Sequence, residues 1–143
     1  MNIIEYKIDK DNNIIFVNEE WDRFALSNFG EEIISEKILG KNLLDFIENI
    51  SVKQIYLDII NQARKGNVIT IDFRCDAPTC RRLLQMTIRP EKNNVVTFFS
   101  KAKEILSWDY INILDSKAIR SIELIPMCSW CKKIKMDSEW EEL

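Results

Sequence analysis

The sequence predicts an α+β fold with a five-stranded antiparallel sheet and a C-terminal extension. Two observations lead to this prediction. Apolar and polar residues alternate, as in half-buried strands, at both ends of the segment 1–101. Apolar residues recur at helical spacing in the middle of that segment, between residues 19 and 66. The expected order along the chain is therefore two strands, several helices and three strands.

Residues 4–9 and 13–18 are expected to form an opening β-hairpin, with the run "KDN" as its turn. Asn18 then caps a helix, because its side-chain oxygen can accept a hydrogen bond from the first helical turn. Glu19 and Glu20 favour the same start, since carboxylates are stabilised at the positive end of a helix dipole. Short helical turns are expected between residues 30 and 51.

The longest helix is predicted to begin at Ser51, which pairs with Gln54 in a capping box. Gly66 is expected to end this helix, because glycine readily adopts the left-handed conformation that often follows a last helical turn. Between these limits the apolar residues recur at helical spacing, at Val52, Tyr56, Ile59, Ile60 and Ala63.

Three strands are predicted after this helix, in the runs "NVITIDFRC", "RLLQMTIRP" and "NVVTFFSK". If residues 76–79 form a four-residue loop, antiparallel pairing places Cys75 opposite Cys80 and Ile71 opposite Leu84. The two cysteines would then share the apolar face at a spacing compatible with a disulfide. Two small buried thiols are the alternative in a reducing compartment.

The chain divides into a domain at residues 1–101, a connector at 102–123 and a Cys-x-x-Cys tail at 124–143. Periodicity is weak in the connector, which fits either a packing helix or a strand-like continuation. The tail carries Trp130 and Trp140, so we expect it to dock rather than to remain in solvent. Its end, "SEWEEL", is typical of a first helical turn, which leaves open a chain that continues past Leu143.

Composition narrows the possible functions. The chain has 143 residues, a net charge of -3 and 46% hydrophobic residues, which describes one soluble domain without the basic face that nucleic acid requires. No run is long and apolar enough for a secretory signal or a membrane span, so we expect a cytoplasmic protein with reduced cysteines. The absence of histidine excludes histidine-ligated haem and any Ser-His or Cys-His nucleophile pair.

Four runs carry a resemblance to a known family: "FVNEEWDRFA", "ILGKNLLDFI", "FRCDAPTCRRLLQMTI" and "MCSWCKKIK". Together with the element order, they resemble a small group of bacterial PAS-like proteins that combine an Arg-Cys-Asp-x-Pro hairpin with a C-terminal Cys-Ser-Trp-Cys-Lys tail. The resemblance implies a five-stranded antiparallel sheet with helices on one face. It also implies a signal-sensing or protein-docking module without catalytic activity.

The residues that match this pattern are Arg74, Cys75, Asp76 and Pro78 in the hairpin and Cys128, Trp130, Cys131 and Trp140 in the tail. Cys80 lies outside the pattern. Asp76 also lies beside Arg81 and Arg82. Because no nucleophile with a base accompanies these charges, we interpret them as a charge network at the hairpin tip rather than as a catalytic cluster.

PAS domains bind small ligands between the long helix, the short helices and the inner face of the sheet. The resemblance therefore implies a candidate pocket whose lining residues are Ile71, Phe73, Leu84, Met86 and Phe98. An ordinary apolar core is the alternative for these side chains. Flavin is not expected, because the Asn-Cys pair of flavin-binding members has no counterpart in "ENISVKQIY".

Zinc is one candidate ligand of the cysteines. Two pairs of cysteines from different segments often complete one tetrahedral zinc site. This chain has one pair in the predicted hairpin and one pair in the tail. The four thiolates would come from Cys75, Cys80, Cys128 and Cys131.

Two further interpretations concern the tail cysteines alone. Cys128 and Cys131 could form a redox pair, in which a neighbouring lysine favours the thiolate. Alternatively they could be small buried neighbours of Met127, Trp130 and Ile134, which would pack from one face of a helical turn. Covalent haem is not expected, since a lysine follows the second cysteine where such a motif requires histidine.

The first functional hypothesis is a non-enzymatic PAS-like homodimer that senses a small ligand or binds a signalling partner, and transmits the result through its C-terminal extension. The alternative is a module that binds zinc or cycles thiol oxidation through the tail.

Overall fold

A computed structural model describes residues 3–111, 114–115, 117–119, 125–128 and 130–142. The chain forms two compact units. The first comprises Met1–Ile71 and Gln85–Lys101, and the second comprises Asp72–Leu84 and Ala102–Leu143. Among the described residues, no helix has the length and apolar composition needed to cross a membrane.

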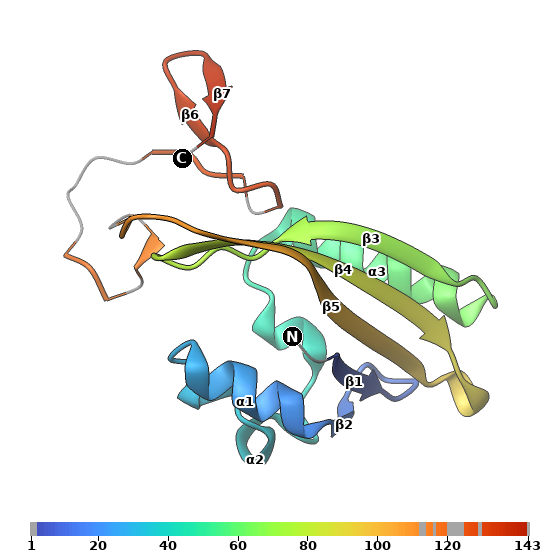
Figure 1. Ribbon diagram of the computed structural model, residues 1–143. Coiled ribbons are helices and arrows are strands. Elements are labelled where there is room, and N and C mark those ends of the chain that lie inside the picture. The colour runs from blue at the N-terminus through green and yellow to red at the C-terminus, as the bar shows by residue number, and fades with distance from the viewer. Residues whose placement is uncertain (1–2, 112–113, 116, 120–124, 129, 143) are drawn as a thin grey trace. The chain divides into compact units, whose positions relative to one another are not determined.

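The order of elements is strands, helices, then strands (Figure 1). The strands are β1 (Ile4–Ile8), β2 (Ile14–Val17), β3 (Ile69–Arg74), β4 (Cys80–Pro90), β5 (Val96–Ser107), β6 (Ile134–Met136) and β7 (Glu139–Glu141). The α-helices are α1 (Glu19–Ser27), α2 (Ser35–Ile38) and α3 (Ile50–Arg64), and short 3-10 turns lie at Glu31–Ile33, Leu43–Phe46 and Lys92–Asn94. Two strands, helices and three strands therefore follow one another as predicted.

The main sheet has five strands in the order β2-β1-β5-β4-β3, and β6 pairs with β7 in a separate two-stranded sheet. β1 runs antiparallel to β2 and to β5. The predicted α+β class with a five-stranded antiparallel sheet is confirmed. β3 lies at one edge of this sheet, so one side of its backbone has no strand partner in it.

Asn18 links the opening hairpin to the first helix, as expected from its capping potential. Its side chain accepts a hydrogen bond from the Trp21 N–H at 3.2 Å and from the Glu5 N–H at 3.1 Å. It also donates to the Ile3 carbonyl at 2.8 Å. One asparagine thus satisfies groups of both β1 and α1, which fixes the direction in which the chain leaves the sheet.

The start of α3 differs from the prediction. Asn49, not Ser51, is the cap, and its side chain accepts the Val52 N–H at 3.0 Å. The predicted capping box at Ser51 and Gln54 is therefore wrong, because Ser51 already lies inside the helix. The helix ends as expected, with Gly66 in the left-handed region at φ +100°.

The register of the β3–β4 hairpin also differs from the prediction. Ala77 pairs with Cys80, and the Cys75 N–H donates to the Arg82 carbonyl at 3.0 Å. The turn therefore contains only Pro78 and Thr79, not four residues, and Cys75 does not face Cys80. The expectation that Cys75 and Cys80 lie directly opposite each other is therefore wrong.

The C-terminal part is built from strands rather than helices. β5 continues to Ser107, into the segment expected as a connector, which agrees with the strand-like alternative. The run expected to open a helix at "SEWEEL" instead contains β7, whose Trp140 pairs with Lys135 of β6. The predicted helical turn there is wrong. Residues 112–113, 116 and 120–123 of the predicted connector, and residue 124 of the predicted tail, lie outside the described residues.

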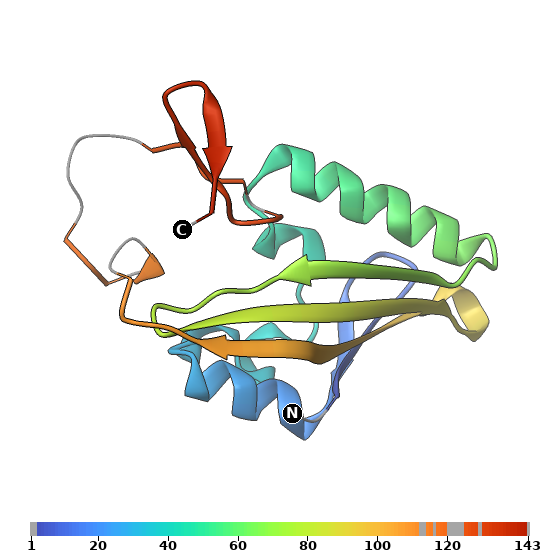
Figure 2. The same ribbon diagram turned by 45° about the horizontal axis from the view of Figure 1, so that its top comes forward.

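The core of the first unit includes the fully buried Phe98 of β5, and helix α3 runs alongside β3 (Figure 2). The Phe98 ring stacks on Tyr6 of β1 at 4.5 Å and on Tyr56 of α3 at 6.4 Å between centroids. Tyr6 also meets Trp21 of α1 edge-on at 5.3 Å. Helices α1 and α3 therefore cover the same face of the sheet, as expected. Each fully buried large apolar side chain contributes about 1.5–3 kcal/mol to this core.

Candidate functional site

The first candidate site is an apolar face where α3 runs along β3. The Thr70 and Thr87 hydroxyls lie 3.4 Å apart across the strands, which continues the register set at the turn. That register places Ile71 opposite Met86, so the two side chains share one face. Met86 is only 2% exposed, whereas Ile71 at the sheet edge stays half-buried.

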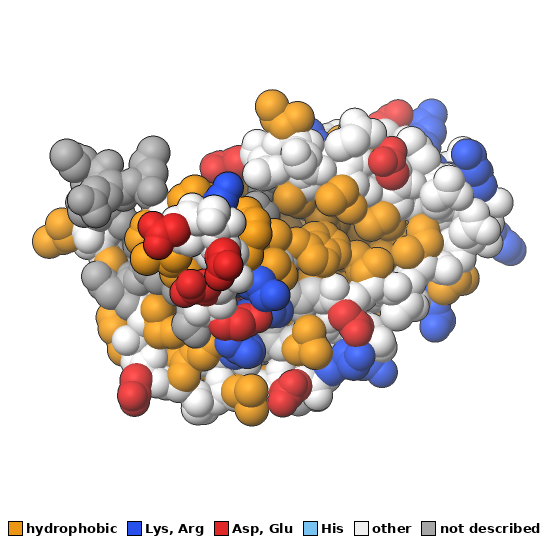
Figure 3. Space-filling model, turned by 90° about the horizontal axis from the view of Figure 1, so that it is seen from above, with side chains coloured by type: hydrophobic (Ala, Val, Ile, Leu, Met, Phe, Trp, Pro, Cys, Tyr) orange, Lys and Arg blue, Asp and Glu red, His pale blue; other side chains and the backbone are white. Residues whose placement is uncertain are grey.

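The helix leaves this edge of the sheet partly uncovered. Tyr56 and Ile59 are half-buried on the side of α3 that faces Phe98, and neighbouring Ile55 is 42% exposed. Seen from above, apolar side chains gather in a hollow alongside α3 (Figure 3). We call the half-buried residues Tyr56, Ile59, Ile69 and Ile71 the α3–β3 face. All four belong to the first unit.

The five residues of the predicted pocket do not all have the same environment. Leu84, Met86 and Phe98 are buried, while Ile71 and Phe73 are half-buried. Ile71, Met86 and Phe98 belong to the first unit, and Phe73 and Leu84 to the second. Of the five predicted pocket residues, only Ile71 belongs to the α3–β3 face. Sequence reasoning missed that Ile71 is partly exposed because β3 lies at the edge of the sheet.

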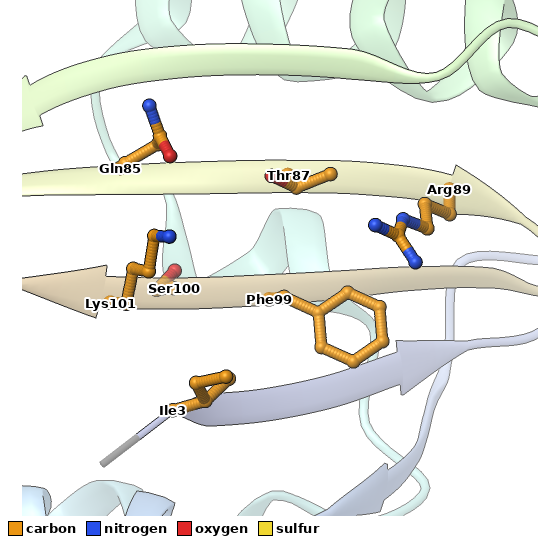
Figure 4. Close-up of a pocket in the computed structure, with 7 residues that line it drawn as sticks. All are labelled: Ile3, Gln85, Thr87, Arg89, Phe99, Ser100 and Lys101. Carbon is orange, nitrogen blue, oxygen red and sulfur yellow. The ribbon is translucent and has the colours of Figure 1, made fainter.

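A second hollow lies on the opposite face of the sheet (Figure 4). Its volume is about 260 Å³, and its lining residues are Ile3, Gln85, Thr87, Arg89, Phe99, Ser100 and Lys101. In the described part of the chain neither Arg89 nor Lys101 forms an ion pair, and the Arg89 guanidinium lies 5.5 Å from the Phe99 ring centroid. The hollow is smaller than the ~300–1,000 Å³ of pockets that enclose ligands. It is a surface depression that sequence reasoning missed, although alternation along Gln85, Thr87 and Arg89 could have indicated it.

A buried charge network lies at the tip of the β3–β4 hairpin, as predicted. The Asp76 side chain is fully buried and forms an ion pair with the Arg74 guanidinium. It also accepts the Arg82 N–H at 3.4 Å, while the Arg82 Nε donates to the Cys75 carbonyl at 2.8 Å. These bonds link the residues at the end of β3 to Arg82 of β4 next to the turn.

The tail docks on this hairpin within the second unit. Glu142 accepts hydrogen bonds from Arg74 and from Arg81, the latter at 3.2 Å. The centroids of the Trp130 and Phe73 rings lie 6.2 Å apart. The backbone carbonyl of Trp130 accepts a hydrogen bond from the Arg74 N–H at 3.4 Å. Arg74 therefore contacts both the hairpin carboxylate and the tail. The prediction that the tail docks is confirmed for these residues.

The connector contributes Trp108 to the same unit. Its indole N–H donates to the Ala77 carbonyl at 3.2 Å, and its backbone N–H donates to the Thr79 carbonyl at 3.0 Å. The Arg81 guanidinium lies 5.2 Å from the Trp108 ring centroid. The hairpin tip is thus held by the segment that follows β5 as well as by the tail.

Cys128 and Cys131 lie in a tight turn that differs from the predicted helical turn. The Lys132 N–H donates to the Cys128 carbonyl at 3.0 Å, and the Cys128 N–H donates to the Lys133 carbonyl at 2.9 Å. The N–H groups of Cys131 and Trp130 donate to the Cys128 sulfur and lower the pKa of its thiol, although partial burial acts in the opposite direction. The Cys131 thiol and the charge of Lys132 lower this pKa further.

The four cysteines do not form one cluster. All four are free and half-buried, and Cys75 and Cys80 pair with Arg82 and Ala77 rather than with each other. Among the described residues, no group of three or more Cys, Asp or Glu side chains is close enough to hold a metal ion. The four-thiolate zinc site inferred from spacing therefore stays a prediction.

Comparison with known proteins adds no relative to this description. No protein-family model matches the chain, and no curated protein matches it.

Proposed function

We propose that this protein is a non-catalytic sensory module of the PAS type, which binds a small apolar ligand at the α3–β3 face. The order of two strands, helices ending in a long one, and three strands is the order that the sequence resemblance implies. In this proposal the module acts in the cytoplasm as a homodimer. The β3–β4 hairpin and the tail would change when the ligand binds, and a signalling partner would recognise that change.

The observation that carries the proposal is the incomplete burial of the α3–β3 face. Ile71 and Ile69 remain half-buried, although the register places them opposite Met86 and Ile88, which are 2% and 0% exposed. Burying such a side chain fully is worth about 1.5–3 kcal/mol, so an apolar ligand that covers the face gains affinity there. The flanking strand edge can also donate backbone hydrogen bonds.

A neutral apolar fluorophore such as Nile red tests this proposal. We expect saturable binding to the native chain, with an emission that rises in the apolar site. Ile71→Lys should weaken binding by about tenfold or more, because a lysine head would have to be desolvated beneath the ligand. Thr70→Lys is the matched control, since Thr70 is exposed on the other face of the same strand.

The outcome that contradicts the proposal is equally specific. If Thr70→Lys weakens binding as much as Ile71→Lys, the fluorophore occupies another surface. If the native chain binds no fluorophore and native mass spectrometry finds no retained small molecule, the α3–β3 face is simply part of a poorly covered core. Circular dichroism of both variants must first match that of the native chain.

A further inference from the structure

The proposed ligand site does not include the turn that carries Cys128 and Cys131, and several backbone hydrogen bonds hold this turn in place. We call the described residues of 126–135 the cysteine turn. The Lys135 N–H donates to the Pro126 carbonyl at 2.8 Å, and Met127 pairs with Ile134 across the turn. Lys132 takes the left-handed conformation at φ 62°. A residue other than glycine is strained in this conformation, so the surrounding hydrogen bonds must hold the backbone in it.

This geometry brings the two thiols together. The Lys132 N–H donates to the Cys128 carbonyl at 3.0 Å, which closes one turn over both cysteines. The backbone N–H groups of Cys131 and Trp130, and the Cys131 thiol, lower the pKa of the Cys128 thiol. Donors aimed at one sulfur stabilise its thiolate, which is the nucleophilic form of cysteine. Because Cys131 lies in the same turn, its thiol can attack the Cys128 sulfur when that sulfur is part of a mixed disulfide. Both residues are half-buried, which leaves room for a small reagent to approach.

The hairpin cysteines provide an internal comparison. Cys75 and Cys80 belong to the same unit and are also half-buried, but their partners across the hairpin are Arg82 and Ala77. The special feature of the tail pair is therefore the turn geometry and not burial or location. A difference in chemistry between the two pairs would follow from that geometry.

We propose that the cysteine turn is a thiol–disulfide exchange site, with Cys128 as the attacking thiol, Cys131 as the resolving thiol, and a small disulfide of the glutathione class as the oxidant. This inference goes beyond the proposed sensory function and does not depend on it. It also differs from the zinc interpretation, because the exchange needs only the two thiols that the turn already holds together.

The exchange proceeds in two balanced steps. The Cys128 thiolate attacks one sulfur of the small disulfide, forms a mixed disulfide and expels the other half as a thiolate, which takes up a proton. Cys131 then loses its proton to solvent and attacks the Cys128 sulfur, which breaks the mixed disulfide and releases the second small thiol. The chain loses two electrons and two protons, and the small disulfide becomes two thiols.

The test uses the full chain equilibrated in glutathione buffers of graded oxidised-to-reduced ratio, quenched in acid and mapped by peptide mass spectrometry. We expect a reversible Cys128–Cys131 disulfide whose fraction rises with the oxidised share of the buffer. Cys131→Ser should stop the reaction at glutathione bound to Cys128. That mixed disulfide should form about tenfold faster than at Cys75 or Cys80, because the turn stabilises the Cys128 thiolate.

Controls separate the proposal from general thiol oxidation. A Cys75→Ser, Cys80→Ser double variant should form the tail disulfide as readily as the native chain. Glutathione on Cys131 in preference to Cys128, a disulfide joining the tail to the hairpin, or no disulfide at any ratio would each overturn the proposal. Stoichiometric zinc that protects both tail thiols would overturn it in favour of a metal site.

A variant that fails to fold does not block the test. Brief labelling of the native chain with limiting iodoacetamide should modify Cys128 before the other three cysteines. Equal labelling of Cys128, Cys75 and Cys80 in the folded native chain contradicts a specially placed attacking thiol.

Discussion

At the scale of single residues, Asp76 and Arg74 form the most buried charged pair in the described second unit. The Asp76 side chain is fully buried and that of Arg74 is 11% exposed, whereas Glu142 on the other side of Arg74 is 48% exposed. Charges removed from water are costly unless they remain paired, while a pair at the surface contributes little. The two contacts of one guanidinium should therefore differ greatly in their energetic effect.

Asp76→Asn should lower the free energy of unfolding by about 3–5 kcal/mol, because it leaves the buried Arg74 charge without a full counter-charge. Glu142→Gln should lower it by only about 0–1 kcal/mol, since that contact is half exposed. Denaturant unfolding followed by near-ultraviolet circular dichroism measures both. A Glu142→Gln cost equal to that of Asp76→Asn would contradict this assignment.

The residues of this network could be predicted from sequence only in part. The run "FRCDAPTCRR" places Arg74, Asp76, Arg81 and Arg82 within one hairpin, so a charge network was a reasonable expectation. The contact of Glu142 with Arg74 joins residues far apart in the chain, and no local pattern marks it. The proximity of Trp130 to Phe73 was equally hidden, because any exposed apolar tail residue can dock in many places.

At the scale of elements, the two errors at α3 and at the β3–β4 hairpin have a common cause. Asn49 and Ser51 are both good capping residues, and the Gln54 that seemed to complete a capping box lies three residues from Ser51 by coincidence. A loop of four or of two residues between β3 and β4 keeps apolar residues facing apolar residues. Local pattern cannot decide between such near-equal choices, whereas tertiary packing does.

Asn49→Ala should destabilise the protein by about 1 kcal/mol, because the Val52 N–H loses its acceptor. Ser51→Ala is the matched control, and it should change stability by less than about 0.5 kcal/mol, since Ser51 is exposed within the helix. Thermal unfolding of the two variants measures the difference. Equal effects, or a larger effect at Ser51, would restore the capping box as the helix start.

Other elements followed from sequence because several local signals agreed. The opening hairpin, the Asn18 cap and the end of α3 at Gly66 each combine a turn residue with a clear change of periodicity. The tail lacked such agreement. Residues 139–141 contain helix-favouring glutamates, yet they pair with β6, because strand pairing outweighs the weak propensity of so short a segment.

At the scale of the whole molecule, two strands belong to both units. β3 passes from the first unit to the second after Ile71, and β4 returns to the first unit after Leu84. The same strand that carries the α3–β3 face thus ends at Arg74, which contacts the tail. A ligand that covers Ile71 would act on a strand whose last residue, Arg74, contacts the tail, and this continuity is the basis for coupling in the proposed sensory module.

Amide hydrogen exchange at the end of β3 and in the tail, with and without saturating Nile red, tests this coupling most directly. The Arg74 and Lys132 amides report on it, because both are hydrogen-bonded at the hairpin–tail contact or within the cysteine turn. The sensory proposal predicts that the fluorophore alters their exchange in the native chain and not in Ile71→Lys. Binding that protects only amides of the first unit, with no change at Arg74 or Lys132, would contradict it.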